Sequence, residues 1–80
     1  MESKKLSKKI KDIMTSVFDV DLSEIDDNCS TDTLEKWDSL KHINLITALE
    51  EEFNVTFNYE DISNMVNYKL IYLILQEKLK

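Results

Sequence analysis

Residues 37–53 read WDSLKHINLITALEEEF, and this stretch decides the fold. At 3.6 residues per turn, its side chains separate onto two faces of a helix. One face carries His42, Leu45, Ile46, Leu49 and Phe53, with Ile43 at its edge. The opposite face carries Leu40, Asn44, Thr47 and Glu51. This amphipathic pattern predicts a helix packed against a hydrophobic core.

The start of this predicted helix combines an N-cap with a serine. Asp38 lies at the N-cap position, where its carboxylate can accept hydrogen bonds from the free N–H groups of the first turn. Ser39 is then held at the positive end of the helix dipole. Because Ser and Asp are common at helix starts for capping alone, this position by itself assigns no function to Ser39.

The whole string carries more information than the serine. The motif Asp38-Ser39-Leu40 is followed at a fixed distance by ALEEEF at residues 48–53, and together they resemble the modification-site helix of acyl carrier proteins. The resemblance extends to the C-terminus and, more loosely, to the N-terminus. It implies that Ser39 receives 4'-phosphopantetheine from coenzyme A, with Asp38 as the other motif residue. The chain would then hold acyl or aminoacyl intermediates as thioesters and pass them between enzymes.

Length and composition indicate one small domain over residues 1–80. The single cysteine, Cys29, cannot form an internal disulfide, which fits a reducing compartment and a buried apolar role. The N-terminus is rich in Lys without the apolar segment of a signal peptide, and the apolar run at 70–75 is too short to span a bilayer. We therefore expect a cytoplasmic protein.

The net charge of −6 is unevenly distributed. Residues 1–18 carry five Lys and two acids, whereas residues 19–61 carry thirteen acids and two Lys. An acidic centre argues against nucleic-acid binding and for partner enzymes with basic docking patches. The N-terminal lysines are interpreted as a solvated helix face. We expect a monomer that does not insert into membranes.

Periodicity and capping residues predict an all-α fold, a small antiparallel four-helix bundle. The three main helices are expected at Ser3–Phe18, at 39–53 and at Tyr68–Leu79, and a short helix at Tyr59–Met65. Asn58 and Asn67 are the expected N-caps of the last two. The long first loop, Asp19–Trp37, contains apolar residues that can pin it across the helix ends: Val20, Leu22, Ile25, Leu34 and Trp37. The apolar run at 70–75 could form a strand, but it has no partner strand.

The sequence also bears on metal binding and on catalysis. The acidic loop fails the calcium-binding EF-hand pattern, and one His with one Cys makes a zinc site improbable, so no metal is expected. Ser39, His42 and Asp38 could suggest a nucleophile, base and orienting acid, but the chain has no glycine for an oxyanion nest, and we predict no enzyme activity. His42 is better interpreted as a mostly buried, neutral residue hydrogen-bonded to the loop. An unmodified acidic docking module remains the alternative function.

Two further groups of residues are candidates for the carrier function. The expected partner-binding residues are Leu40, Lys41, Asn44, Thr47 and Glu51. The expected partners are a phosphopantetheinyl transferase and the enzymes that load and unload the arm. The candidates for sheltering an acyl chain are Leu45, Leu49, Phe53, Ile62 and Ile71, which plain core packing would explain equally well.

The chain also departs from the family pattern at four positions. Lys41 and Asn44 stand where fatty-acid carriers usually have acids, Lys36 replaces a usual Gly, and Trp37 replaces a small residue. These departures favour a dedicated carrier in a specialised pathway over one that serves bulk fatty acid synthesis.

Overall fold

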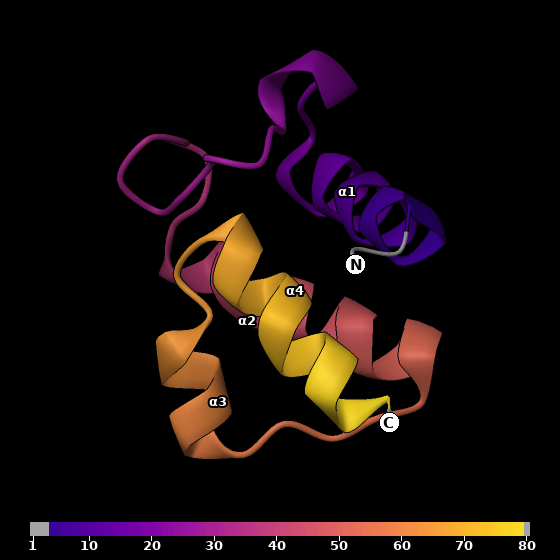
Figure 1. Ribbon diagram of the computed structural model, residues 1–80. Helices are drawn as coiled ribbons and strands as arrows, with labels where there is room; N and C mark the ends of the chain where they lie inside the picture. Colours follow the sequence, from indigo (N-terminus) through magenta and orange to yellow (C-terminus); the bar gives the residue numbers. More distant parts are fainter. Residues whose placement is uncertain (1–3, 80) are drawn as a thin grey trace.

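The computed structural model describes residues 4–79 of the chain. Its elements are α1 (Lys4–Phe18), the 3-10 turn η1 (Leu22–Glu24), α2 (Ser39–Phe53), α3 (Tyr59–Asn64) and α4 (Tyr68–Lys78) (Figure 1). Among the described residues there is no strand, only an isolated bridge between Ser30 and Asn67. The predicted all-α fold of three main helices and a short one is confirmed. Ser3, the predicted start of the first helix, lies outside the described residues.

Side-chain caps fix where three of the helices begin. Asp38 accepts a hydrogen bond from the backbone N–H of Lys41 at 2.8 Å, and Asn67 accepts one from Leu70 at 2.8 Å. Asn58 accepts from the N–H of Asp61 at 2.7 Å. Each cap satisfies a backbone donor that the first turn of a helix leaves free. The predicted caps are confirmed, and the helix ends differ from prediction by a single residue: Met65 and Leu79 are C-caps.

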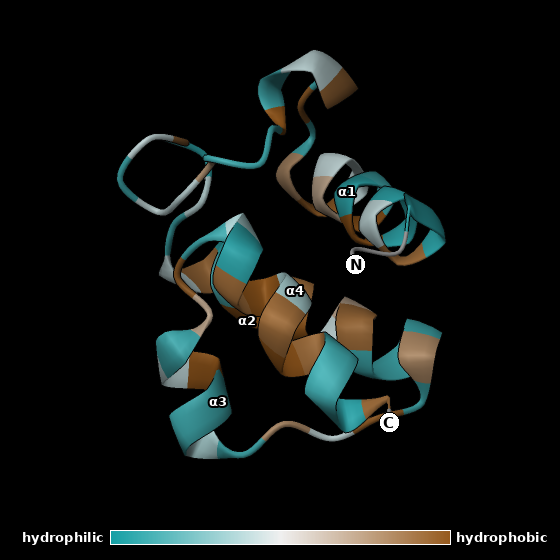
Figure 2. Cartoon of the chain, viewed as in Figure 1, coloured by the Kyte–Doolittle hydropathy of each residue, from teal (hydrophilic) through white to brown (hydrophobic). Residues whose placement is uncertain are grey.

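The core lies between α1, α2 and α4, and the first loop closes it. Helix α1 packs chiefly on α2 and also contacts α4. Figure 2 shows apolar residues concentrated on α2 and α4, while polar residues cover much of α1. The side chains with no exposed surface are Ile10, Met14, Phe18, Leu45, Leu49, Met65, Ile71 and Leu75. The apolar run at residues 70–75 lies within α4, so the predicted helix is confirmed and the alternative of a strand is excluded.

The first loop is anchored by side chains and by backbone hydrogen bonds. Ile25, Leu34 and Trp37 are buried and Val20 is half-buried, but Leu22 is 54% exposed. The prediction that Leu22 pins the loop is therefore wrong. Leu22 opens the η1 turn and lines a shallow groove with Lys4 and Lys11 of α1, so its side chain stays at the surface.

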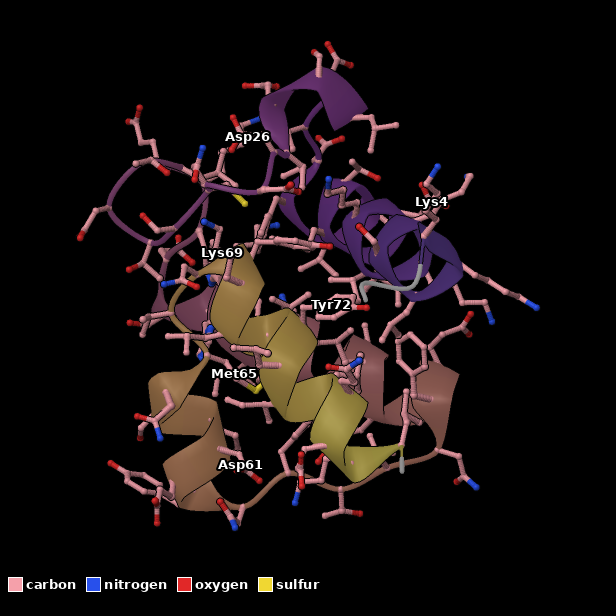
Figure 3. The ribbon with its side chains drawn as sticks, in the orientation of Figure 1. Lys4, Asp26, Asp61, Met65, Lys69 and Tyr72 are labelled. Atoms are coloured by element: carbon pink, nitrogen blue, oxygen red, sulfur yellow. The ribbon has the colours of Figure 1, made fainter. Side chains whose placement is uncertain are left out.

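The loop also joins the segment between α3 and α4. The N–H of Tyr68 donates to the carbonyl of Cys29, and the N–H of Thr31 donates to the carbonyl of Val66, both at 3.0 Å. Cys29 is buried as predicted, and this burial raises the pKa of its thiol. Met65, fully buried, lies between α3 and α4 (Figure 3). These contacts hold the first loop against the segment that joins α3 to α4.

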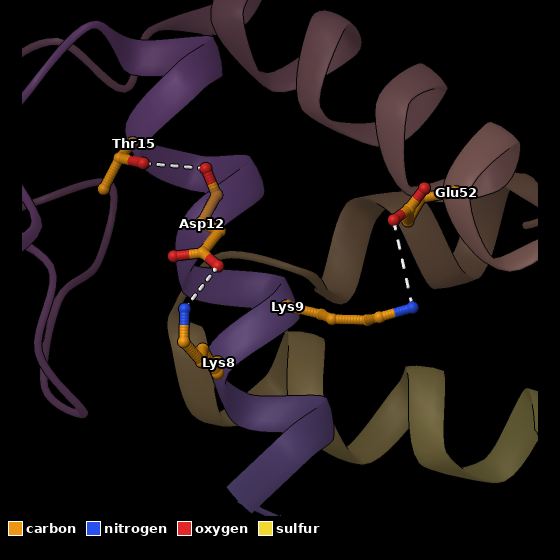
Figure 4. A network of polar contacts seen from close by, with 5 residues as sticks. All are labelled: Lys8, Lys9, Asp12, Thr15 and Glu52. Atoms are coloured by element: carbon orange, nitrogen blue, oxygen red, sulfur yellow. Dashed lines mark hydrogen bonds and ion pairs between the residues drawn. The ribbon is translucent and has the colours of Figure 1, made fainter.

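The lysines of α1 form local ion pairs at the surface. Figure 4 shows Lys8 paired with Asp12 at 3.1 Å on the same helix, and Lys9 reaching Glu52 of α2 at 4.0 Å. Lys11 contacts Asp27 of the first loop at 2.8 Å and holds the pKa of that carboxyl below its ordinary value, chiefly through the hydrogen bond. The exposed lysines agree with the predicted solvated face, although several of them have acidic neighbours.

Candidate functional site at the start of helix α2

Ser39 is the first residue of α2 and is exposed to solvent. Asp38 precedes it in an extended conformation and caps the helix, while the carbonyl of Asp38 accepts from the N–H of His42 at 2.8 Å. No other described residue hydrogen-bonds to the Ser39 hydroxyl. The local sequence thus fixes the backbone at this serine and leaves its side chain available for reaction with an approaching enzyme.

His42 joins the start of α2 to α3. The indole Nε1–H of Trp37 donates to Nδ1 of His42 at 3.0 Å, and Nε2 of His42 lies 2.9 Å from the carbonyl oxygen of Ile62. Because an indole only donates and a carbonyl only accepts, these partners assign the neutral tautomer with its hydrogen on Nε2. We call this arrangement of Trp37, His42 and Ile62 the His42 clasp. The half-buried imidazole agrees with the sequence prediction and adds a partner on α3.

The partners of His42 and Asp38 also bear on the nucleophile–base alternative. Both ring nitrogens of His42 are hydrogen-bonded to groups other than Ser39. One carboxylate oxygen of Asp38 accepts from the backbone of Lys41. These hydrogen bonds give the side chains of His42 and Asp38 structural roles at the helix start.

A groove of about 540 Å³ opens beside Ser39, between the start of α2, α3 and the first loop. Its lining consists of Thr31, Trp37, Asp38, Ser39, His42, Ile43, Ile62, Ser63 and Val66. Among these, Trp37 is only 3% exposed, and its ring packs in a tilted arrangement against the Phe18 ring, with 5.1 Å between centroids. The groove brings together residues from three segments, of which sequence reasoning had singled out Ser39, Asp38, His42 and Ile62.

An ion pair at Asp61, the residue before Ile62, also anchors α3. The carboxylate of Asp61 lies 3.0 Å from the ammonium of Lys78 in α4. This hydrogen bond is the main reason that the pKa of Asp61 lies below its ordinary value. Figure 3 shows Asp61 on the part of α3 that lies toward α4. Together with the His42 clasp, this pair holds α3 as one wall of the groove.

The predicted partner-binding residues lie mostly on one exposed face of α2. Leu40 is 69% exposed beside the serine, and Asn44, Thr47 and Glu51 are also exposed, while Lys41 is half-buried. Ile43, predicted at the edge of the apolar face, is 55% exposed and extends the apolar surface toward the groove. Large apolar side chains that are exposed close together are typical of a protein-contact surface.

The five candidates for sheltering an acyl chain do not form one open cavity. Leu45, Leu49 and Ile71 are completely buried in the core. Phe53 is half-buried at the other end of α2, roughly 20 Å from Ser39 at 1.5 Å per residue. Only Ile62 lines the groove beside the serine.

Residues 4–79 contain no group of three or more His, Cys, Asp and Glu side chains arranged to hold a metal ion. Within the same residues, no helix has the length and hydropathy needed to cross a membrane.

Known proteins that resemble this chain are acyl carrier proteins. No family model matches the chain. The chain is 29% identical to polyketide-8 synthase acyl carrier protein 1 of Streptomyces avermitilis over 69 residues. The aligned part covers 86% of this chain and 82% of that protein. The fold superposes on the solution structure of a holo acyl carrier protein from Geobacter metallireducens with a TM-score of 0.82 and 27% identity, covering 91% of this chain and 84% of the other. The chain is therefore similar to acyl carrier proteins in both sequence and fold. It begins α2 with an exposed serine in an Asp-Ser-Leu motif.

Proposed function

We propose that this chain carries acyl or aminoacyl intermediates as thioesters on a 4'-phosphopantetheine arm attached to Ser39. The observation that supports the site is the exposed serine at the start of α2, with its hydroxyl unengaged among the described residues. Similarity in sequence and fold to acyl carrier proteins supports the carrier function, since one similar structure is that of a holo acyl carrier protein. We expect the arm to come from coenzyme A through a phosphopantetheinyl transferase.

The residues around Ser39 fit an attached phosphodiester. Helix N-termini favour anions because their N–H groups and the helix dipole point toward the ligand. Asp38 fixes the first turn through the N–H of Lys41, so the serine keeps one orientation toward the incoming enzyme. When bound, the arm supplies a terminal thiol that holds the cargo as a thioester. The protein's own part is to present the hydroxyl, hold the helix start and offer a docking surface.

The docking surface that we propose surrounds the attachment point. Leu40 supplies an apolar contact, and Lys41, Asn44, Thr47 and Glu51 extend it along α2. The acidic charge of residues 19–61 favours loading and downstream enzymes with basic patches. Lys41 and Asn44 make the first half of α2 less acidic than its second half, which supports a dedicated carrier in a specialised pathway. A relative named for polyketide synthesis agrees with such a pathway.

We propose further that residues 1–80 act as one carrier domain without catalytic activity of its own. The hydrogen bonds of His42 to Trp37 and Ile62 support a structural role for the imidazole. The buried, unpaired thiol of Cys29 supports a reducing compartment, which we take to be the cytoplasm. In this proposal the protein is a monomer and binds its partner enzymes one after another.

Covalent modification is the direct test. The protein is incubated with coenzyme A, magnesium and a broad-range phosphopantetheinyl transferase, and its intact mass is measured. We expect a gain of one phosphopantetheinyl group, which Ser39→Ala abolishes. Ser63→Ala is the matched control, because Ser63 is an exposed serine that lines the same groove. No gain, or a gain that survives Ser39→Ala, would contradict the carrier function and favour the unmodified docking module.

A further inference from the structure

The groove beside Ser39 is separated from the hydrophobic core by the His42 clasp. All three clasp residues line the groove, whereas the completely buried side chains Leu45, Leu49 and Ile71 do not. The imidazole spans the seam between α2 and α3, with one nitrogen bonded to Trp37 and the other to the carbonyl of Ile62. A group that passed from the groove into the core at this seam would have to displace His42.

Displacing His42 would leave polar groups without partners. The indole Nε1–H of Trp37 belongs to a side chain that is only 3% exposed, so water cannot readily replace the imidazole as its acceptor. A buried donor without an acceptor is unfavourable because it has lost its hydration without a replacement. The seam is therefore closed by hydrogen bonding as well as by apolar packing.

The groove itself offers mixed chemistry to a group resting at the surface. Ile43 and Val66 supply partly exposed apolar surface from two sides. The residues Thr31 and Ser63 bring hydroxyl groups to the same lining. A short or polar acyl or aminoacyl group gains little from the core and can find both kinds of contact here.

We infer that His42 determines where the cargo rests, keeping the acyl group in the groove and out of the core. This inference depends on the proposed attachment at Ser39 and extends it to the class of cargo, namely short or polar acyl and aminoacyl groups. His42 is a specificity-determining residue in this account, and it acts by holding the seam closed.

The test compares His42→Leu with His42→Gln. Leucine removes both hydrogen bonds, whereas the amide of glutamine can still donate to the Ile62 carbonyl. Trp37→Phe is a second variant that removes only the indole donor and keeps an aromatic ring beside Phe18. Each protein is loaded with an acetyl group, an octanoyl group or an acyl fluorophore whose emission reports the polarity of its surroundings. Intact mass verifies loading first, so a failure of the proposed attachment is recognised separately.

In the parent protein and in His42→Gln, we expect water-like emission and equal melting temperatures for the acetyl and octanoyl forms. In His42→Leu, the emission should shift to the blue, and octanoylation should raise the melting temperature by several degrees, with a smaller effect in Trp37→Phe. Blue-shifted emission in the parent protein, or water-like emission in a folded His42→Leu, would overturn the inference.

Hydrogen exchange on the unloaded proteins tests the clasp independently of the arm. The N–H of Ile62 donates to Asn58 and the N–H of Met65 donates to Ile62, so both report on the wall formed by α3. These two amides should exchange faster in His42→Leu and Trp37→Phe than in the parent protein or His42→Gln. Unchanged exchange in both disrupting variants would overturn the role of His42 even if no loading occurred.

Discussion

The two ends of α2 are built differently, although the same helix joins them. At the N-terminal end, hydrogen bonds fix the backbone around Ser39 and leave its side chain and that of Leu40 exposed. At the C-terminal end, side chains are engaged in the fold: Glu50 accepts from the N–H of Phe57 at 2.9 Å, and Lys9 lies over the Phe53 ring. One end leaves its side chains exposed, and the other end joins the helix to the next segment.

This difference changes how the acids of α2 are interpreted. Glu50, Glu51 and Glu52 form a continuous acidic run in the sequence. In the structure, Glu50 stabilises the turn to Phe57, and Glu52 lies 4.0 Å from Lys9. Glu51 is exposed, and it is the member of the run that the sequence placed on the docking face. A charged residue on a recognition helix therefore need not be a recognition residue.

The largest effect is expected from a substitution that removes a contact at the C-terminal end of α2. Glu50→Ala removes the acceptor of the Phe57 N–H, and an unsatisfied half-buried donor costs about 1–3 kcal/mol of unfolding free energy. Urea denaturation measures the loss, and modification of Ser39 should continue while the protein is folded. Glu50→Gln is the matched control, because its amide oxygen can still accept. Equal stability of Glu50→Ala and the parent protein would show that this hydrogen bond does not hold the turn.

The second effect is expected from a substitution that removes an exposed side chain at the N-terminal end of α2 and leaves the fold intact. Leu40→Ala removes a mostly exposed side chain, so the free energy of unfolding should change by less than about 0.5 kcal/mol. Transfer to every partner enzyme should slow, because a central apolar contact is typically worth about 1–2 kcal/mol of binding. Steady-state kcat/KM with two unrelated partners measures this loss. Normal transfer with either partner would remove Leu40 from the shared docking surface.

A third change sharpens the electrostatic part of the comparison. Lys41→Asp with Asn44→Glu makes the start of α2 acidic like its end, and should improve use by a generic fatty-acid ketoacyl or malonyl partner. Exposed pairs contribute about 0.2–1 kcal/mol each, so the gain should reach up to about tenfold, mainly in the association rate. Rates are compared at low and moderate salt, since screening weakens the effect. No gain at low salt would show that missing acids do not select the partners.

The smallest effect concerns the wall of the groove and depends on pH. Since the pKa of Asp61 is lower in the folded protein than in the unfolded chain, its pair with Lys78 adds stability above the unfolded pKa, and that stability is lost as pH falls through the folded pKa. Asp61→Asn should therefore lose about 0.2–1 kcal/mol at neutral pH, and the difference should shrink as the pH falls from about 4 through the lower folded pKa. Melting curves of both proteins from pH 3 to pH 7 measure this difference. A difference that persists undiminished in acid would assign the effect to the hydrogen bond that the Asp61 side chain accepts from the backbone N–H of Asn58, instead of to the charge.

Local patterns predicted the framework of this molecule correctly. Helical periodicity and the caps Asp38, Asn58 and Asn67 depend on residues within one turn of each other, so the sequence contains all the information they need. The Asp-Ser-Leu motif singled out the exposed serine in the same way. The outward direction of Leu22 depends instead on how η1 packs beside α1, which short-range patterns do not record.

The groove and the clasp could not be predicted because their parts are far apart in the chain. Ile62 offers a backbone carbonyl, a group that every residue has, and only the packing of α3 brings it to His42. Thr31, Ser63 and Val66 are ordinary residues in sequence and become groove residues through the same packing. The one sequence signal for the clasp is the spacing of Trp37 and His42, five residues apart. A buried indole N–H usually finds an acceptor, and His42 is within reach.

The burial of Cys29 has a practical consequence for labelling. Its thiol has a raised pKa and little access to solvent, so the reactive thiolate is scarce at neutral pH. Cys29 is also the only cysteine in the sequence. After attachment of the arm at Ser39, maleimides and other thiol-directed reagents should react with the terminal thiol of the arm well before they reach the protein. A fluorophore or spin label can therefore be placed on the moving end of the carrier in the natural sequence, without first replacing a cysteine.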